Sequence, residues 1–173
     1  MGKTILTTGL AAGLIAGGFC SLFALTLSHA IPTSAAMVIG YLTMLVALSL
    51  IGVAVKRERD ARGAIGFWRA FGMGLAITVV ASVLYALCWE ATLAYMGGPD
   101  TFIDGYAAGL RRHGGDPDAL AQMEAMRLNY RHLWFRLPIT MTEILPAGVL
   151  VSLVAAALLR NPRFMPATRT AAS

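Results

Sequence analysis

The chain has 173 residues, of which 57% are hydrophobic and only 13% charged, and its formal net charge is +5. Soluble domains carry about 25% charged residues, so this composition excludes an ordinary soluble domain and indicates a membrane protein. The basic excess does not indicate binding to nucleic acid, because the cations lie in short clusters beside apolar runs instead of on one continuous soluble face.

Four apolar runs predict four membrane-spanning helices. The region from Thr4 to Val55 contains no Asp, Glu, Lys or Arg, and it is long enough for two spans because about twenty apolar residues cross a bilayer. A tight turn at Pro32 would join them. The spans are expected at about 4–28, 35–55, 70–95 and 137–159. The predicted fold class is all-α, a single bundle of four transmembrane helices over residues 1–161.

The charges beside the spans predict how the bundle is oriented. Nine basic and two acidic residues lie on the side of the two termini and of the 56–69 loop, whereas the other side carries five of each. Cytoplasmic loops are enriched in Lys and Arg, so we expect both termini in the cytoplasm. Residues 97–136 then form the outward loop, and residues 162–173 are expected to be a disordered cytoplasmic tail.

The outward loop is expected to be partly helical and to cap the bundle. Asp116 followed by Pro117 is typical of a helix start, since it combines a capping carboxylate with a residue suited to the first helical position. Apolar residues follow at helical spacing at Ala119, Met123, Met126, Tyr130 and Leu133. This pattern predicts an amphipathic helix that lies on the bilayer or covers the bundle ends. A shorter apolar segment at 102–110 is expected to do the same, and a partner-binding groove is the alternative.

Glu90 and Glu143 are the two acidic residues expected within the spans. Each lies six to seven residues from the outward end of its predicted span, about 10 Å along a helix, so they fall at similar depth. Tyr41, with Cys20 and Ser21, is expected in the same layer. The sequence therefore predicts a layer of polar groups in the outward half of the bundle.

A carboxylate at this depth is disfavoured by a few kcal/mol, at order of magnitude, unless it is paired, hydrated or protonated. One hypothesis is a proton- or cation-binding site formed by Glu90, Glu143 and Tyr41, in which the two carboxylates share a proton if they meet. The other is structural, with each carboxylate protonated or bonded to Tyr41, Thr140 or Arg136 and serving only to fix helix packing.

Small residues recur at four-residue spacing on several spans. Gly9, Gly13 and Gly17 form such a stripe on the first span. Similar stripes run through Gly74 to Glu90 on the third span and from Gly148 on the fourth. Small residues let helix backbones approach closely in a membrane. We expect these stripes to pack within one bundle, with homodimerisation through the first span left open.

No pattern points to a metal, a cofactor or catalysis. His29, His113 and His132 do not share a helix at ligand spacing. The sequence also lacks a Gly-rich phosphate loop, a zinc-protease motif and a serine with a nearby base. We therefore expect no metal site, no cofactor, no catalytic residues and no enzymatic activity.

The loop between the second and third predicted spans carries a recognisable signature. It consists of Arg59-Asp60 and Gly63-Ala64-Ile65-Gly66-Phe67. Later parts of the chain carry further residues of the same pattern, which are Tyr85, Trp89-Glu90, Tyr130 and Pro146-Ala147-Gly148. The chain resembles, over about residues 4–161, the bacterial domain-of-unknown-function family forty-one ninety-nine. This resemblance implies a four-span protein of the bacterial inner membrane with no assigned activity.

The signature residues also have a physical interpretation. Gly63 and Gly66 would allow a sharp return into the membrane, while Phe67 would lie in the headgroup layer. The alternative is a docking surface for a cytoplasmic partner or an anionic lipid.

The leading functional expectation is a non-enzymatic structural or accessory membrane protein. The alternative is a small transporter or a proton- or cation-binding protein that uses Glu90 and Glu143. The expected partner is the lipid bilayer, and a second copy or another membrane protein is left open.

Overall fold

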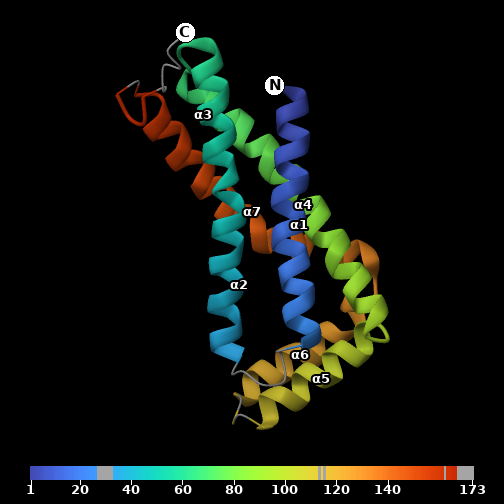
Figure 1. Cartoon of the computed structure of the whole chain (residues 1–173). Coiled ribbons are helices and arrows are strands. Elements are labelled where there is room, and N and C mark those ends of the chain that lie inside the picture. Colours follow the sequence, from blue (N-terminus) through green and yellow to red (C-terminus); the bar gives the residue numbers. More distant parts are fainter. Residues whose placement is uncertain (27–32, 113, 115, 162, 167–173) are drawn as a thin grey trace.

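The computed structural model describes residues 1–26, 33–112, 114, 116–161 and 163–166, and this part of the chain is almost entirely helical with no strand (Figure 1). The predicted turn at Pro32 and most of the predicted tail, residues 162 and 167–173, lie outside the described residues. The helices are α1 (Gly2–Thr26), α2 (Thr33–Leu48), α3 (Leu50–Arg62), α4 (Phe67–Tyr95), α5 (Pro99–Arg112), α6 (Pro117–Tyr130) and α7 (Leu133–Leu159).

The described residues contain four helices that are long and apolar enough to cross a membrane, which are α1, α2 joined to α3, α4 and α7. This confirms the all-α bundle expected from the sequence. Only Ser49 separates α2 from α3, and its backbone N–H still donates to the carbonyl of Leu45. The start of α1, the α3–α4 turn and the end of α7 lie at one end of the bundle, here called the terminal end (Figure 1).

The second long helix continues past the expected span end at residue 55 and reaches Arg62. Two ion pairs at four-residue spacing support this extension, Lys56 with Asp60 at 2.5 Å and Glu58 with Arg62 at 2.6 Å. Such pairs stabilise a helix surface. The charge cluster expected as a loop is therefore mostly the last two turns of α3.

Helix α4 lies between α1 and α7, and α1 packs on it through the glycine stripe. A Cβ atom added at Gly13 would lie 2.8 Å from the carbonyl oxygen of Ala81, and one at Gly17 would lie 2.8 Å from the Cβ of Cys88. Gly9 is equally close to Val80. Each step of four residues along α1 is matched by a similar step along α4, so the two helices run parallel in a fixed register.

Helix α7 packs antiparallel on the small-residue stripe of α4. A Cβ at Gly74 would lie 2.6 Å from the Oγ of Ser152, and a Cβ at Gly148 would overlap the side chain of Thr78. Four residues forward on α4 correspond to four residues back on α7. The small residues thus serve contacts within the bundle, and the direct approach of backbones that they permit stabilises helix pairs in a membrane.

The joined helix α2–α3 is packed most firmly near the terminal end. Leu48, Ile51 and Val55 are fully buried in the hydrophobic core. On α2, in contrast, Met37 and Tyr41 are exposed. The opposite half of this helix therefore leaves space between itself and its neighbours.

Helices α5 and α6 form a cap at the end of the bundle opposite the terminal end (Figure 1). Ion pairs connect these two helices, Arg127 with Asp104 at 2.7 Å, while Arg131, the residue after α6, pairs with Asp100 at 3.0 Å. Helix α6 begins as expected, with the Asp116 side chain accepting from the backbone N–H of Asp118 at 3.0 Å.

The lengths of the two cap helices and their share of buried residues differ from the expectation. The segment expected to be shorter, α5, is as long as α6, at 14 residues, and contributes the buried residues Ile103 and Ala107. Helix α6 has no buried residue. Leu133 belongs to α7 instead of continuing the α6 face, because α6 ends at Tyr130. The cap is therefore a helical pair with α5 innermost.

Candidate functional site

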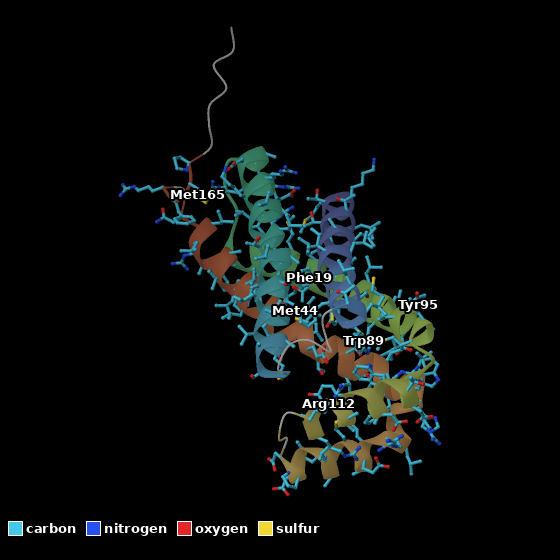
Figure 2. The ribbon with its side chains drawn as sticks, turned by 60° about the horizontal axis from the view of Figure 1, so that its bottom comes forward. Phe19, Met44, Trp89, Tyr95, Arg112 and Met165 are labelled. Atoms are coloured by element: carbon cyan, nitrogen blue, oxygen red, sulfur yellow. The ribbon has the colours of Figure 1, made fainter. Side chains whose placement is uncertain are left out.

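A cavity of about 490 Å³ lies beneath the cap, in the half of the bundle where α2 stands away from its neighbours. Its walls come from α1, α2, α4, α5, α6 and α7. Phe19, Met44 and Trp89, labelled in Figure 2, represent α1, α2 and α4 among the lining residues. The volume is within the range of about 300–1,000 Å³ typical of small-molecule sites.

Most of the cavity wall is aromatic or aliphatic. The aromatic lining residues are Phe19, Phe23, Tyr41, Tyr85, Trp89, Phe102, Tyr106 and Tyr130. Methionines from α2 and α6 fill much of the remainder, and Met side chains adapt readily to ligands of different shape. Among the described residues that line the cavity, Glu143 is the only Asp, Glu, Lys, Arg or His.

Glu143 is held at the cavity wall by a tyrosine from α4. The Tyr85 hydroxyl, which is buried, donates to Oε2 of Glu143 at 3.1 Å, and the same hydroxyl lies 3.6 Å from the Sγ of Cys20 on α1. Glu143 itself is exposed. Three residues further along α7, Pro146 lacks the N–H donor of a regular helical residue, and α7 nevertheless continues as one helix to Leu159.

Glu90 has a different environment, because it forms a two-bond ion pair with Arg136 of α7. The Nε and Nη2 atoms of Arg136 donate to the Glu90 carboxylate at 2.8 and 2.6 Å. The remaining nitrogen, Nη1, donates to the carbonyl oxygens of Tyr130 and Arg131 at 2.7 and 2.9 Å. A cation is favourable at such a helix C-terminus. Arg136 therefore connects α4, α7 and the end of the cap helix α6.

The aromatic residues of the cap are fixed to the same region. Trp89 donates its indole N–H to the Tyr130 hydroxyl at 3.1 Å, and the ring of Phe102 packs against both residues with centroids 5.1 and 6.2 Å away. Burial is the main reason that the pKa of Tyr130 is raised above its usual value. At the cap surface, the hydrogen bond that Arg127 donates to the Asp104 carboxylate is the main cause that raises the pKa of Arg127.

The two carboxylates predicted to share a layer have separate partners. Glu143 lines the cavity together with Tyr41, as grouped from the sequence, whereas Glu90 is not among the lining residues. The helix register explains the difference. Arg136, the partner of Glu90, precedes Glu143 by seven residues, which is about 10 Å along α7. The geometry of Glu90 matches the structural hypothesis, in which the carboxylate is bonded to Arg136.

Sequence reasoning did not identify the tyrosine partner of Glu143 or the aromatic walls from α1 and α5. Tyr85 lies beside the small-residue stripe of α4, three residues after Ser82. A tyrosine hydroxyl beside a helix-packing stripe could have indicated a hydrogen bond to a neighbouring helix. Phe19 and Phe23 gave no signal, because aromatic residues at this spacing are equally typical of a lipid-facing surface.

The loop signature residues lie at the terminal end, and none of them lines the cavity; they are Arg59, Asp60, Gly63, Gly66 and Phe67. Arg59 is 4% exposed, and its guanidinium donates to the Asp60 carboxylate and to the carbonyl oxygens of Phe164 and Met165. Gly63 ends α3 with φ +79°, a conformation that favours glycine. Arg59 and Asp60 therefore tie the segment after α7 to α3.

Gly66 does not require the conformational freedom of glycine, which was expected from the sequence. Its φ of −76° and ψ of 152° are accessible to any residue, and it precedes α4 as an extended cap. Phe67 stacks on Phe71 at 5.9 Å, with Trp68 edge-on to it. In the turn between α3 and α4, Gly63 therefore has the left-handed conformation and Gly66 does not.

The fold and the cavity define a helical membrane protein with a partly open, mainly aromatic chamber and one carboxylate among the described residues of its wall. The chain belongs to the family described as "Protein of unknown function (DUF4199)", whose model matches residues 11–161. The match includes most of α1 and all of α2 to α7. Comparisons with curated proteins and with solved structures found no match.

Proposed function

We propose that this protein is a non-enzymatic, multi-pass protein of a bacterial inner membrane that binds a small, largely apolar molecule in the cavity beneath its cap. The observation that carries the proposal is the cavity of about 490 Å³ with its aromatic and methionine walls. Largely apolar cavities with a few polar groups are the usual form of small-molecule sites.

The basic residues support an orientation with the cap outside the cytoplasm. Among the residues that the structure describes, eight of the 14 Lys and Arg residues of the chain lie at the terminal end, where the positive-inside rule places the cytoplasm. The cavity would then open in the periplasmic half of the bilayer. Its position between α1 and α2 suits a ligand that arrives from the membrane.

The alternative of a transporter that uses both carboxylates finds less support. Glu90 is neutralised by Arg136, which leaves Glu143 as the single carboxylate of the cavity wall among the described residues. Binding at this site is therefore the better-supported function, and Glu90 has a structural role.

The test uses Trp89 as a reporter, because it lines the cavity whereas Trp68 and Trp134 are 79% and 85% exposed. In the protein with Trp68→Phe and Trp134→Phe, reconstituted in lipid nanodiscs, we expect the uncharged quencher bromobenzene to quench Trp89 fluorescence saturably. Quenching requires contact, so saturation indicates a site and a linear response indicates partition into lipid.

A matched pair of variants locates the site. Gly40 lines the cavity, and a Cβ there meets nothing within 4 Å, so the side chain of Gly40→Phe starts in open space and should occupy part of the chamber. Gly18 on α1 is equally open but does not line the cavity, so Gly18→Phe is the control. We expect Gly40→Phe to abolish the saturable quenching and Gly18→Phe to retain it. Equal behaviour of the two variants would refute the proposal.

A further inference from the structure

Glu143 differs from the other acidic residues of the membrane-spanning helices in having no basic partner. Glu58 pairs with Arg62, Asp60 with Lys56 and Arg59, and Glu90 with Arg136. Within the described part of the chain, Glu143 forms no ion pair, and its carboxylate accepts a hydrogen bond from the neutral hydroxyl of Tyr85 at 3.1 Å. The nearby cation Arg136 is already bonded to Glu90 and to two carbonyl groups.

The walls around Glu143 favour a cation that has an apolar body. Tyr85, Trp89, Phe102 and Tyr130 come from α4, α5 and α6 and line the same chamber. Aromatic faces carry a negative potential and attract cations, most strongly where water is excluded, and cages of such rings recognise quaternary ammonium groups. The ring of Tyr130 already attracts one cation, since the Arg136 guanidinium lies 5.9 Å from its centroid. An anion would meet the Glu143 carboxylate, and no described lining residue is basic, so it would be disfavoured.

The donor set does not suit a small inorganic cation. Ca²⁺ takes about 6–8 oxygen ligands, whereas the described lining residues offer one carboxylate and several phenol hydroxyls. The described residues contain no cluster of three or more His, Cys, Asp or Glu side chains able to hold a metal ion. One negative charge among aromatic rings matches a large monovalent cation better than a small divalent one.

We propose that the ligand of the cavity is a lipophilic organic cation, with Glu143 as its counter-ion and the aromatic walls in contact with its apolar groups. This inference rests on the proposed function and names its ligand class. Tyr41 on α2 and Tyr85 on α4 both line the chamber and would contact the ligand beside the carboxylate.

The test compares two ions of the same shape and opposite sign, tetraphenylphosphonium and tetraphenylborate. Binding to the nanodisc-reconstituted full chain is measured by equilibrium dialysis, with empty nanodiscs of the same lipid subtracted. We expect Glu143→Gln to raise the Kd for tetraphenylphosphonium at least about tenfold. Tetraphenylborate binding should not weaken in this variant, because the repelling charge is removed.

Glu124→Gln is the matched control, because it removes the same charge from α6 at a residue whose side chain is 68% exposed and does not line the cavity. It should leave tetraphenylphosphonium binding unchanged, and Glu143→Asp should retain most of it. An unchanged Kd in Glu143→Gln, or an equal loss in both Gln variants, would overturn the inference.

Competition in the protein with Glu143 intact keeps the inference testable if Glu143→Gln fails to fold. Tetraphenylphosphonium should displace bromobenzene from the Trp89 site at concentrations at which tetraphenylborate does not. Equal displacement by the two ions would overturn the inference. Saturable bromobenzene quenching without cation preference would refute only the ligand class, whereas loss of saturable quenching would refute the proposed function itself.

Discussion

Two glutamates of the same bundle have different roles because their neighbours differ. Arg136 is 8% exposed and holds Glu90 with two hydrogen bonds while a third nitrogen contacts the end of α6. Glu143 has a tyrosine hydroxyl in place of a guanidinium and faces a chamber. The sequence placed both glutamates at similar depth and named Arg136 among their candidate partners, but it could not assign which carboxylate Arg136 binds, since this depends on the register between α4 and α7.

The Glu90–Arg136 pair leads to a prediction about stability. Arg136→Met should destabilise the protein by about 3 kcal/mol, because it leaves the Glu90 carboxylate buried without its counter-ion and removes a donor to two carbonyl groups. The double variant Glu90→Met/Arg136→Met should recover part of this loss. Unfolding by SDS in mixed micelles, followed by circular dichroism, measures both.

Arg131→Met provides the comparison, since the ion pair of Arg131 with Asp100 is about half exposed on each side. It should change the free energy of unfolding by less than about 1 kcal/mol. Similar losses from Arg131→Met and Arg136→Met would contradict a special role for the buried pair.

Helix α4 determines the arrangement of the elements, because it has a small-residue contact on each side. Spacing of four predicted these stripes and their use within one bundle. It could not predict which helix each stripe contacts, because Gly13 on α1 and Gly148 on α7 carry the same pattern. The partner follows from side-chain shape, with Ala81 and Leu84 opposite Gly13 and Thr78 opposite Gly148.

A pair of glycine substitutions on α1 tests this packing. In Gly13→Ala the new methyl group would lie 2.8 Å from a backbone oxygen of α4, which cannot move without shifting the helix, so we expect a loss of about 1–3 kcal/mol. Gly18→Ala adds the same methyl group in open space and should be neutral or stabilising by up to about 1 kcal/mol. SDS unfolding of both variants provides the measurement, and equal effects would contradict the proposed contact.

At the scale of the whole molecule, apolar length predicted the number of membrane-spanning helices correctly, whereas the cavity had no counterpart in the sequence. The chamber lies beside α2, where the joined helix α2–α3 is exposed at Tyr41, whereas the same helix is buried from Leu48 of α2 to Ile51 and Val55 of α3. No local pattern specifies such a difference, because it depends on how several large side chains fill one volume. The boundaries of α3 and α7 also differed from prediction. Ion pairs extend α3 beyond its apolar run to Arg62, and α7 begins at Leu133, four residues before the predicted start.

The orientation of the molecule can be tested with single cysteines in a variant that lacks Cys20 and Cys88. A cysteine at Asp118, on α6, should react with a membrane-impermeant maleimide in intact bacterial cells whose outer membrane has been permeabilised. A cysteine at Gly2, at the start of α1, should react only after the inner membrane is broken. We expect this result because the basic residues are concentrated at the terminal end. Labelling of Gly2→Cys while the inner membrane is intact would show that the orientation is the opposite one.

The glycine contacts of α1 also bear on how the protein is made. The surface that α1 presses against belongs to α4, which is synthesised only after α2 and α3 have followed α1 into the membrane. Until then Gly9, Gly13 and Gly17 face lipid or the insertion machinery, and α1 has no close helical neighbour along that stripe. Assembly of the bundle therefore waits for its third long helix, and a chain truncated before Phe67 would leave α1 and α2 as a hairpin without its packing partner.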